Sequence, residues 1–372
     1  MSRELTSSVD AAGALPVWSR LRSWEGAALL VLLALPIIPG VTAFMDGLGI
    51  QLEGQLARIF IFALLALGLN LQVGQAGLLQ LGIAAFFAIG AYTCGILTVD
   101  KYPFQLGFWG ALIAAPLVAA MAGLALGAPT IRLRGDYLAI VTLGFGEVVR
   151  VVLVNLENIT DGPRGLNPIP PPLLPEWLTP SGLGPVETRT RVLYYISLII
   201  LAALVVVLRT LERLRIGRAF VALREDELVS ACMGMNPVQT KLAAFAAGAG
   251  LAGLAGALYA TNLASTADPS NYDFNLSIMT LCALIIGGLG SIRGVLLGSF
   301  VLLAFDNVLS PMITKWLQGD DAAGGPTNVL TSFSNWRWII FGTALVLMMR
   351  FRPKGLWPES AEDRAAGARR SA

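Results

Sequence analysis

The stretch VLYYISLIILAALVVVL, residues 192–208, contains no charged side chain. A helix rises about 1.5 Å per residue, so a run of this length approaches the ~30 Å thickness of the hydrocarbon layer of a membrane. Comparable apolar runs, of roughly 16 to 24 residues, recur along the chain. Together they predict an all-α polytopic membrane protein.

The overall composition agrees with this fold class. Of 372 residues, 55% are hydrophobic and 13% are charged, and the charged share is about half that of a soluble globular protein. The net charge of +2 says little, because the location of Lys and Arg matters more than their sum. Nothing in the chain suggests a nucleic-acid partner. The three cysteines have no paired spacing and there is no histidine, so we expect no disulfide framework, metal site or cofactor.

We expect about ten transmembrane helices. Their predicted positions are 25–43, 56–73, 77–99, 106–128, 137–156, 192–208, 241–264, 274–288, 293–309 and 336–351. The first run follows several arginines, as a signal sequence does, but no convincing small-residue cleavage site follows it. We therefore expect it to be retained as a span.

The basic residues predict the orientation. With the N-terminus inside, the main basic clusters of the short loops all fall on the cytoplasmic side, as the positive-inside rule requires. These clusters lie at Arg132 and Arg134, in the charged loop 209–240, at Arg293 and in the tail from Arg350. Both termini are then cytoplasmic.

Three regions follow from this topology. We expect a cytoplasmic segment at 1–24, a transmembrane domain at 25–357 that includes the loop 209–240, and a disordered cytoplasmic tail at 358–372. The outer segment 157–191 is rich in Pro and Gly, which favour turns over helix. It is either a surface linker or a lid or docking surface.

Two glycine-rich segments are expected to form hairpins at cytoplasmic turns. The first is GLNLQVGQAGLLQLGIAAFFAIGAY, residues 68–92, and the second is IIGGLGSIRGVLLG, residues 285–298. Glycine permits tight turns and close helix contact, and it can leave backbone groups facing a pathway. The alternative is that the small residues only pack helices together.

The first glycine-rich segment also carries four amide side chains. They are Asn70, Gln72, Gln75 and Gln80. Uncharged amides can line a route for a polar solute while avoiding most of the cost of a buried charge. Hydrogen bonding between helices is the alternative.

Glu147 and Arg150 lie within the predicted span 137–156. A separation of three residues places them on nearly the same helix face. Because an unpaired charge there would cost roughly 2.5 to 3.5 kcal/mol, we expect them to form an ion pair. The pair is either a pathway or gating element or a structural contact between helices.

The charged loop contains RLRIGRAFVALREDELVSACMGMN, residues 213–236. Three acidic residues, Glu225 to Glu227, favour the N-terminal end of a short helix, and Gly234 with the following Asn-Pro favours its end.

An apolar stripe is expected along this short helix. It consists of Leu228, Ala231, Cys232 and Met235, at positions i, i+3, i+4 and i+7. Such a stripe either fills a groove on a partner protein or packs on the chain's own helix ends.

Several segments resemble, in the same order, those of branched-chain amino acid ABC transporter permeases, over residues 60–357. They are LRGDYLAIVTLGFGEVVRVVL, IGRAFVALREDELVSACMGMN, KLAAFAAGAGLAGLAGALYA, IIGGLGSIRGVLLG and RPKGLWP. The resemblance implies a cytoplasmic coupling helix, which inserts into a cleft of an ATPase subunit. The residues implied in coupling are Arg224, Glu225, Asp226, Glu227, Leu228, Ala231, Cys232 and Gly234. The chain has no G-x-x-x-x-G-K-[ST] phosphate loop, so the ATPase is expected to be another chain.

The chain departs from the family pattern in two places. The family commonly reads close to VGYAGQLSLGHAAFFGIGAY in the first glycine-rich segment, where this chain has Gln75, Leu78, Gln80 and Ile83 at the Tyr, Gln, Ser and His positions. These changes alter polarity beside the expected pathway and put the substrate in doubt more than the architecture. Ala231 stands where relatives often carry Glu.

The resemblance implies a permease subunit of an ABC importer in the bacterial inner membrane, which passes branched-chain or other hydrophobic amino acids inward and does no covalent chemistry. The implied partners are ABC ATPase subunits, a second permease subunit in a heterodimer, a periplasmic substrate-binding protein and membrane lipid. Two alternatives stay open: the same architecture carrying urea, short amides or another small solute, and an ion-coupled secondary carrier. A membrane-embedded enzyme is least supported, because the chain has no nucleophile–base constellation.

Overall fold

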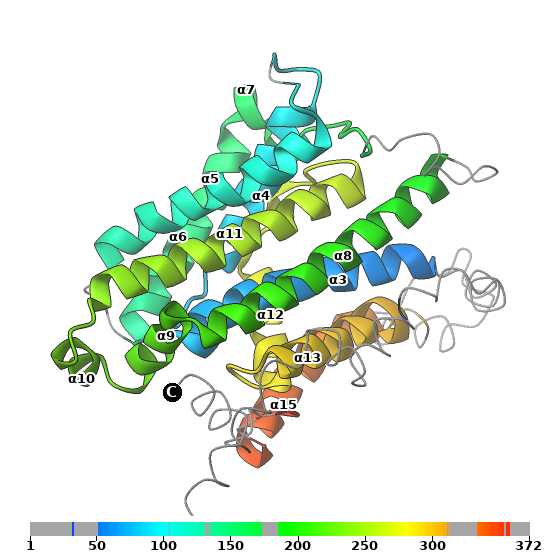
Figure 1. Ribbon diagram of the computed structural model, residues 1–372. Helices are drawn as coiled ribbons and strands as arrows, with labels where there is room; N and C mark the ends of the chain where they lie inside the picture. Colours follow the sequence, from blue (N-terminus) through cyan, green and yellow to red (C-terminus); the bar gives the residue numbers. More distant parts are fainter. Residues whose placement is uncertain are drawn as a thin grey trace, which may run out of the picture. The chain divides into compact units, whose positions relative to one another are not determined.

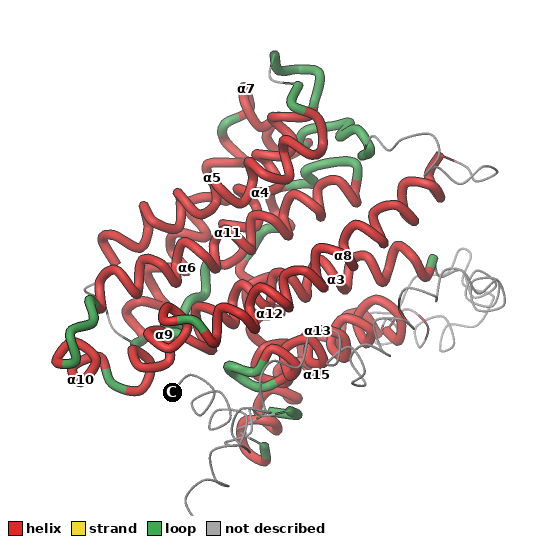
Figure 2. The backbone as a smooth tube through the Cα atoms, viewed as in Figure 1, coloured by secondary structure: helices red, strands yellow, loops and turns green. Residues whose placement is uncertain are grey.

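This computed structural model describes residues 32, 51–103, 105–130, 133, 135–172, 185–310, 312, 333–352 and 355–357. Every regular element among them is a helix (Figure 2). The chain divides into two units, 1–53 and 54–372, and the second contains the features considered below. The expected first span at 25–43, the segment 1–24 and the tail 358–372 lie outside the described residues.

Figure 1 shows the helices along the chain. In order they are α3 (Leu52–Leu69), η4 (Asn70–Gln75), α4 (Ile83–Thr98), α5 (Gly107–Thr130), α6 (Asp136–Asn155), α7 (Glu157–Thr160), η5 (Gly162–Arg164), α8 (Pro185–Arg213), α9 (Arg215–Glu225), α10 (Glu227–Cys232), α11 (Pro237–Leu263), η7 (Pro269–Asn271), α12 (Phe274–Gly287), α13 (Ile292–Ala304), η8 (Phe305–Leu309) and α15 (Phe333–Phe351). Elements η4 and η8 are π-helical, and η5 and η7 are 3₁₀ turns.

Six helical stretches among the described residues are long and apolar enough to cross a membrane. They are Leu52–Gln75, Gly107–Thr130, Asp136–Asn155, Thr188–Arg213, Pro237–Leu263 and Ile292–Leu309. Helices α4, α12 and α15 lie at three further positions where we expected spans. The all-helical membrane fold is therefore confirmed, while the number of ten crossings stays a prediction.

The most extensive packing joins α11 to α5 and α4, and Figure 1 shows α5 and α11 running side by side. On α5, small residues recur every fourth position and share one face: Ala111, Ala115, Ala119, Gly123 and Gly127. A Cβ atom added at Gly253 of α11 would overlap Ala119 and lie 2.9 Å from the carbonyl oxygen of Ala115. A Cβ at Gly256 would overlap the carbonyl oxygen of Phe87 on α4. Small residues thus allow the helix backbones to touch, as in other membrane bundles.

Helices α12 and α13 pack on each other in the same way. A Cβ at Gly287 would overlap the carbonyl oxygen of Gly294, and a Cβ at Gly298 would overlap that of Ala283. The C-terminal end of the described chain closes this pair, because the amide of Trp357 donates to the carbonyl oxygen of Gly287 over 3.1 Å. Leu356 and Trp357 therefore hold the end of α12, since the amide of Leu356 also donates to the carbonyl oxygen of Ile286 over 2.9 Å.

Candidate coupling segment and substrate pathway

Local backbone and side-chain contacts define both ends of helix α10. The Oδ1 atom of Asp226 accepts hydrogen bonds from the amides of Leu228 (2.8 Å) and Val229 (3.1 Å), two of the donors that a helix start leaves without a partner. Gly234 follows the helix with φ of 84°, a left-handed conformation that glycine adopts readily. Asn236 then caps α11. The sequence therefore forms a short, separate helix between α9 and α11.

The apolar stripe of α10 is mostly open to solvent in this chain. Leu228 is 70% exposed, Ala231 and Cys232 are also exposed, and Met235 is half-buried. Met233, beside the stripe, is 79% exposed. An apolar face left open in this way is a surface that another protein can cover.

Other residues of α10 hold it to the helix bundle. The ammonium group of Lys241, on α11, donates to Oε1 of Glu227 over 2.7 Å. The Lys241 side chain is only 7% exposed. Ser230 is buried on α10, and its hydroxyl donates to the carbonyl oxygen of Asp226 over 2.7 Å. Glu225, in contrast, is exposed.

Arg224, in the last turn of α9, reaches back to the first glycine-rich segment. Its guanidinium group donates a hydrogen bond to the carbonyl oxygen of Gly74. Its aliphatic chain lies against Gly77, where an added Cβ would come within 3.0 Å of Cγ of Arg224. A Cβ at Gly290, in the second glycine-rich segment, would lie 3.1 Å from Nη1 of Arg224. One side chain thus contacts both glycine-rich segments.

Two of the amide side chains expected in the pathway bind other parts of the chain. The Oδ1 atom of Asn70 accepts a buried hydrogen bond of 2.9 Å from the amide of Gly290. Nε2 of Gln72 donates to the carbonyl oxygen of Phe245 over 3.1 Å. Gly248 leaves room for this side chain, since a Cβ there would lie 2.5 Å from Cδ of Gln72. Both amides lie on the π-helical η4, a kind of helix often found at functional sites.

The other two amides differ from each other. Nε2 of Gln75 donates to Oε1 of Glu212, at the end of α8, over 2.8 Å. Gln80 is buried, and neither of its side-chain polar atoms has a hydrogen-bond partner among the described residues. Among the four amides, Gln80 thus leaves both of its polar atoms available for a solute or a water, and Gln72 leaves only its Oε1 atom.

The expected ion pair between Glu147 and Arg150 forms on α6. Nε of Arg150 lies 3.1 Å from each carboxylate oxygen of Glu147, and Nη2 also contacts Oε1. The side chains are 50% exposed for Glu147 and 27% for Arg150. The pair therefore lies on an outer face of this chain, where lipid or a partner subunit would meet it.

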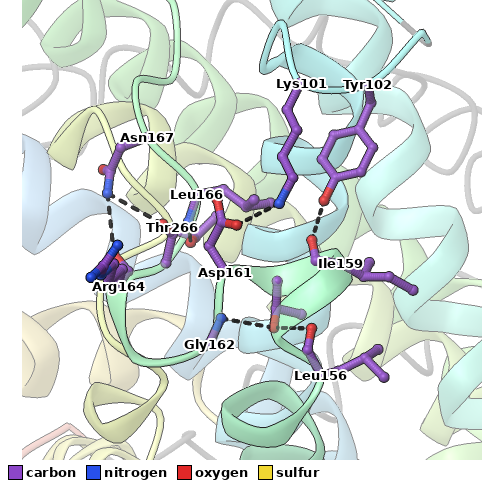
Figure 3. Close-up of polar contacts among 12 residues, drawn as sticks. Lys101, Tyr102, Leu156, Ile159, Asp161, Gly162, Arg164, Leu166, Asn167 and Thr266 are labelled. Carbon is purple, nitrogen blue, oxygen red and sulfur yellow. Dashed lines mark hydrogen bonds and ion pairs between the residues drawn. The ribbon is translucent and has the colours of Figure 1, made fainter.

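A network beyond the C-terminal ends of α4 and α6 anchors the start of the 157–191 segment (Figure 3). Lys101, between α4 and α5, forms an ion pair with Asp161. This hydrogen bond raises the pKa of Lys101 above its usual value. The hydroxyl of the neighbouring Tyr102 donates to the carbonyl oxygen of Ile159. The sequence carries no signal for these contacts, because the partners lie about 60 residues apart.

The next residues of the same segment pair with the loop between α11 and α12. The amide of Leu166 donates to Oγ1 of Thr266 over 2.8 Å, and the amide of Thr266 donates to the carbonyl oxygen of Leu166 over 3.1 Å (Figure 3). The amide of Ile169 donates to the carbonyl oxygen of Ala264 over 2.8 Å. The segment is therefore anchored up to residue 169, and residues 173–184 lie outside the described part of the chain.

A small cavity, also missed by reasoning from the sequence, lies between α3, α12 and α13. Its lining residues are Phe62, Ala66, Met279, Thr280, Ala283, Ser299, Leu302 and Leu303. Ser299 is fully buried, and its hydroxyl has no hydrogen-bond partner within the described ranges. The rest of the lining is apolar except for Thr280, whose hydroxyl donates to the carbonyl oxygen of Leu276 over 2.8 Å, so the cavity offers few of the polar partners that a bound water needs. The described residues contain no group of His, Cys, Asp or Glu arranged to hold a metal ion.

These features define the class of the protein. The chain is a multi-pass helical membrane protein with a short capped helix, α10, between two of its long helices. Residues 51–349 match the family described as the permease component of the branched-chain amino acid transport system. The chain belongs to this family.

Individual relatives agree with the family assignment. The chain is 38% identical over 344 residues to the high-affinity branched-chain amino acid transport system permease protein LivM of Salmonella typhimurium, covering 88% of this chain and 75% of the relative. It is 24% identical over 332 residues to a probable LivM of Methanocaldococcus jannaschii, covering 80% and 91%. It is 22% identical over 249 residues to LivH of Salmonella typhimurium, covering 65% and 79%. No solved structure matches the chain at a significant level.

Proposed function

We propose that this chain is a permease subunit of a bacterial ABC importer that moves branched-chain or other hydrophobic amino acids into the cytoplasm. Its membership of the branched-chain amino acid permease family, over residues 51–349, is the observation that carries the proposal. The name of the LivM relative, a high-affinity branched-chain amino acid transport system permease protein, supports the same substrate class. The chain does no covalent chemistry, and separate ATPase subunits hydrolyse ATP.

The proposed topology has about ten crossings of the inner membrane, with two glycine-rich hairpins and both termini on the cytoplasmic side. The distribution of Lys and Arg supports this orientation. The transmembrane permease domain spans 25–357, between a cytoplasmic segment at 1–24 and a cytoplasmic tail at 358–372. The coupling loop 209–240 then faces the cytoplasm, where an ATPase can reach it.

The proposed assembly contains a second permease subunit, ATPase subunits and a periplasmic substrate-binding protein, all within or beside membrane lipid. The similarity to relatives named LivM and LivH supports a heterodimer of two related permeases. The anchored residues 157–169 give the outer face a built surface on which a binding protein could dock.

The coupling helix of this proposal is α10. Its exposed apolar stripe supports insertion into a groove of the ATPase, because an amphipathic helix lays its apolar face into such grooves. The residues assigned to coupling are Arg224, Glu225, Asp226, Glu227, Leu228, Ala231, Cys232 and Gly234. ATP can shift the permease between inward-open and outward-open states only if the contacts of the coupling segment differ between them.

The same proposal includes six polar residues as candidates for the substrate pathway, of which Glu147 and Arg150, on an outer face of this chain, border it only where a partner subunit completes it. They are Asn70, Gln72, Gln75, Gln80, Glu147 and Arg150. Gln80 is the amide best suited to meet the solute, since both of its buried side-chain polar atoms lack a partner among the described residues, whereas Gln72 lacks a partner at Oε1 alone. Asn70, Gln72 and Gln75 support the walls of the pathway through their hydrogen bonds within the chain.

Uptake by the reconstituted complex tests the proposal. The chain, its partner permease and their ATPase subunits are placed in liposomes with ATP inside and the binding protein outside, and proton and sodium gradients are collapsed. We expect ATP-dependent accumulation of labelled leucine, isoleucine or valine, with competition by the other two.

Two other results would identify the alternatives. Competition by urea or short amides, without competition by aliphatic amino acids, would replace the proposed substrate. Accumulation by the chain without ATPase subunits, driven by an imposed ion gradient, would replace the ABC mechanism with a secondary carrier.

A further inference from the structure

The two glycine-rich segments meet in one buried junction, although they lie 220 residues apart. The Asn70 side chain accepts the hydrogen bond from the amide of Gly290. A Cβ at Gly74 would overlap Oδ1 of Asn70 and lie 2.6 Å from the backbone nitrogen of Gly290. The junction of Asn70, Gly74 and Gly290 therefore brings a π-helix and a turn into direct backbone contact, which only glycine at position 74 allows.

This junction joins four long helices. Residue 74 belongs to η4, which continues α3, and Gly290 lies in the turn between α12 and α13. The neighbouring Gln75 binds Glu212 at the end of α8. A separation of η4 from the turn would therefore move α3 and α8 relative to α12 and α13, because packed helices move as rigid bodies.

Arg224 connects the coupling segment to this junction. It lies two residues before Asp226, the cap of α10, and its guanidinium group binds the Gly74 carbonyl oxygen and lies beside Gly290. Its aliphatic chain is in close contact with Gly77. The head group is therefore directed to its own chain, at the point where the two glycine-rich segments meet.

A second contact holds α10 on its other side. The ion pair of Lys241 with Glu227 joins the first residue of α10 to α11. The coupling helix is thus fastened at its start to the junction through Arg224 and to α11 through Glu227. Only Glu225 and Asp226 separate Arg224 from α10 in the chain. A displacement of α10 therefore moves Arg224, and the Arg224 side chain transmits the movement to Gly74.

We propose that the junction of Asn70, Gly74 and Gly290 is the cytoplasmic gate of the transport pathway, and that Arg224 is the positioning residue through which movement of α10 opens it. This inference rests on the proposed function. The two segments meet through the neutral hydrogen bond from the amide of Gly290 to Asn70 and through backbone contact at Gly74, so they can part without repacking of large side chains. The charged hydrogen bond from Arg224 is the stronger contact and keeps η4 attached to the coupling segment.

The test replaces Arg224 with methionine, which keeps the aliphatic chain beside Gly77 and removes the donor to Gly74. In the reconstituted complex, we expect R224M to hydrolyse ATP in response to loaded binding protein, while leucine uptake per ATP hydrolysed falls about tenfold, the effect of losing a charged hydrogen bond. R224K keeps a cationic donor and should restore most of the uptake. R218M removes an exposed cation from the same helix and should behave as wild type.

Each outcome decides the proposal. Unchanged uptake per ATP in R224M would overturn it. Loss of ATPase binding in R224M would also overturn it, because Arg224 would then contact the partner directly. If R224M unfolds at a lower temperature than wild type, R224K and N70L are compared instead. The proposal then requires that N70L hydrolyse more ATP than wild type in the absence of solute. It fails if ATP hydrolysis by N70L matches that of wild type. Absence of ATP-driven uptake in the wild-type complex would instead contradict the proposed function.

Discussion

Arg224 donates a hydrogen bond to the carbonyl oxygen of Gly74, which lies 150 residues earlier in the chain. This contact joins the segment expected to couple the permease to an ATPase with the segment expected to line the pathway. Asn70 and Gly290 lie at the same place, held by their own hydrogen bond. The two groups of candidate residues, separate in the sequence, therefore form one connected region at the ends of α3, α9 and α12.

The first prediction concerns the close approach at Gly74. The substitution G74A should lower the free energy of unfolding by about 1–3 kcal/mol, because the added methyl group meets Asn70 and the backbone of Gly290. Thermal unfolding of the detergent-solubilised protein measures this. The control is G144A, at an exposed glycine of α6 with nothing within 4 Å of an added Cβ, which should leave the stability unchanged or slightly raised. Equal effects of the two substitutions would contradict the packing at the junction.

The second prediction concerns the cap of α10. D226A should weaken the start of the helix by about 1 kcal/mol, because the amides of Leu228 and Val229 lose their acceptor. Hydrogen exchange of these two amides should then be about fivefold faster. D226N, which keeps an acceptor oxygen, should exchange nearly as slowly as wild type. Equal exchange in D226A and wild type would show that another group caps this helix.

The third prediction concerns the exposed stripe. L228E should weaken binding of the ATPase subunit about tenfold, the effect expected at the centre of a protein interface, and should leave the unfolding temperature unchanged because Leu228 is exposed. Affinity is measured with the purified ATPase and the permease in nanodiscs. V221E, at an exposed apolar residue of α9 outside the stripe, is the control. A loss of affinity in V221E alone would move the docking surface to α9.

The fourth prediction concerns the helix core. G256A should lower stability by about 1–3 kcal/mol, since the methyl group would overlap the carbonyl oxygen of Phe87 and push α11 away from α4. The unfolding temperature in detergent measures the loss. Gly342, on α15, has open space around its Cβ position, so G342A should have no such cost. A stable G256A protein would mean that α4 and α11 are not in backbone contact.

The fifth prediction concerns the outer network. The hydrogen bond to Asp161 raises the pKa of Lys101. A cation whose pKa is raised by folding contributes stability below its unfolded pKa, about 10.4, and loses it as the pH rises through the folded value. The stability difference between wild type and K101M should therefore be small, constant from pH 6 to pH 9 and smaller in high salt, because the pair is exposed. A difference that grew with salt would contradict the ion pair.

Much of the fold could be predicted from hydropathy and from residue types at helix ends. The apolar run 192–208 lies within α8, and Asp226 and Gly234 bound α10 as their residue types indicated. Helix α8 is longer than the apolar run because its flanking charged residues continue the helix as far as Arg213. Such features are local, since a helix satisfies its own backbone hydrogen bonds.

The sequence by itself determined the helical membrane class, the short helix between α9 and α11 and the close pairing of Glu147 with Arg150, because each depends on neighbours within a few residues. Only the tertiary structure decided the partners of the amides, the ion pair of Lys241 with Glu227 and the contact of Arg224 with Gly74. These contacts depend on how helices distant in the chain pack. Small residues recur throughout this sequence and are compatible with many helix packings, so the sequence alone does not select one.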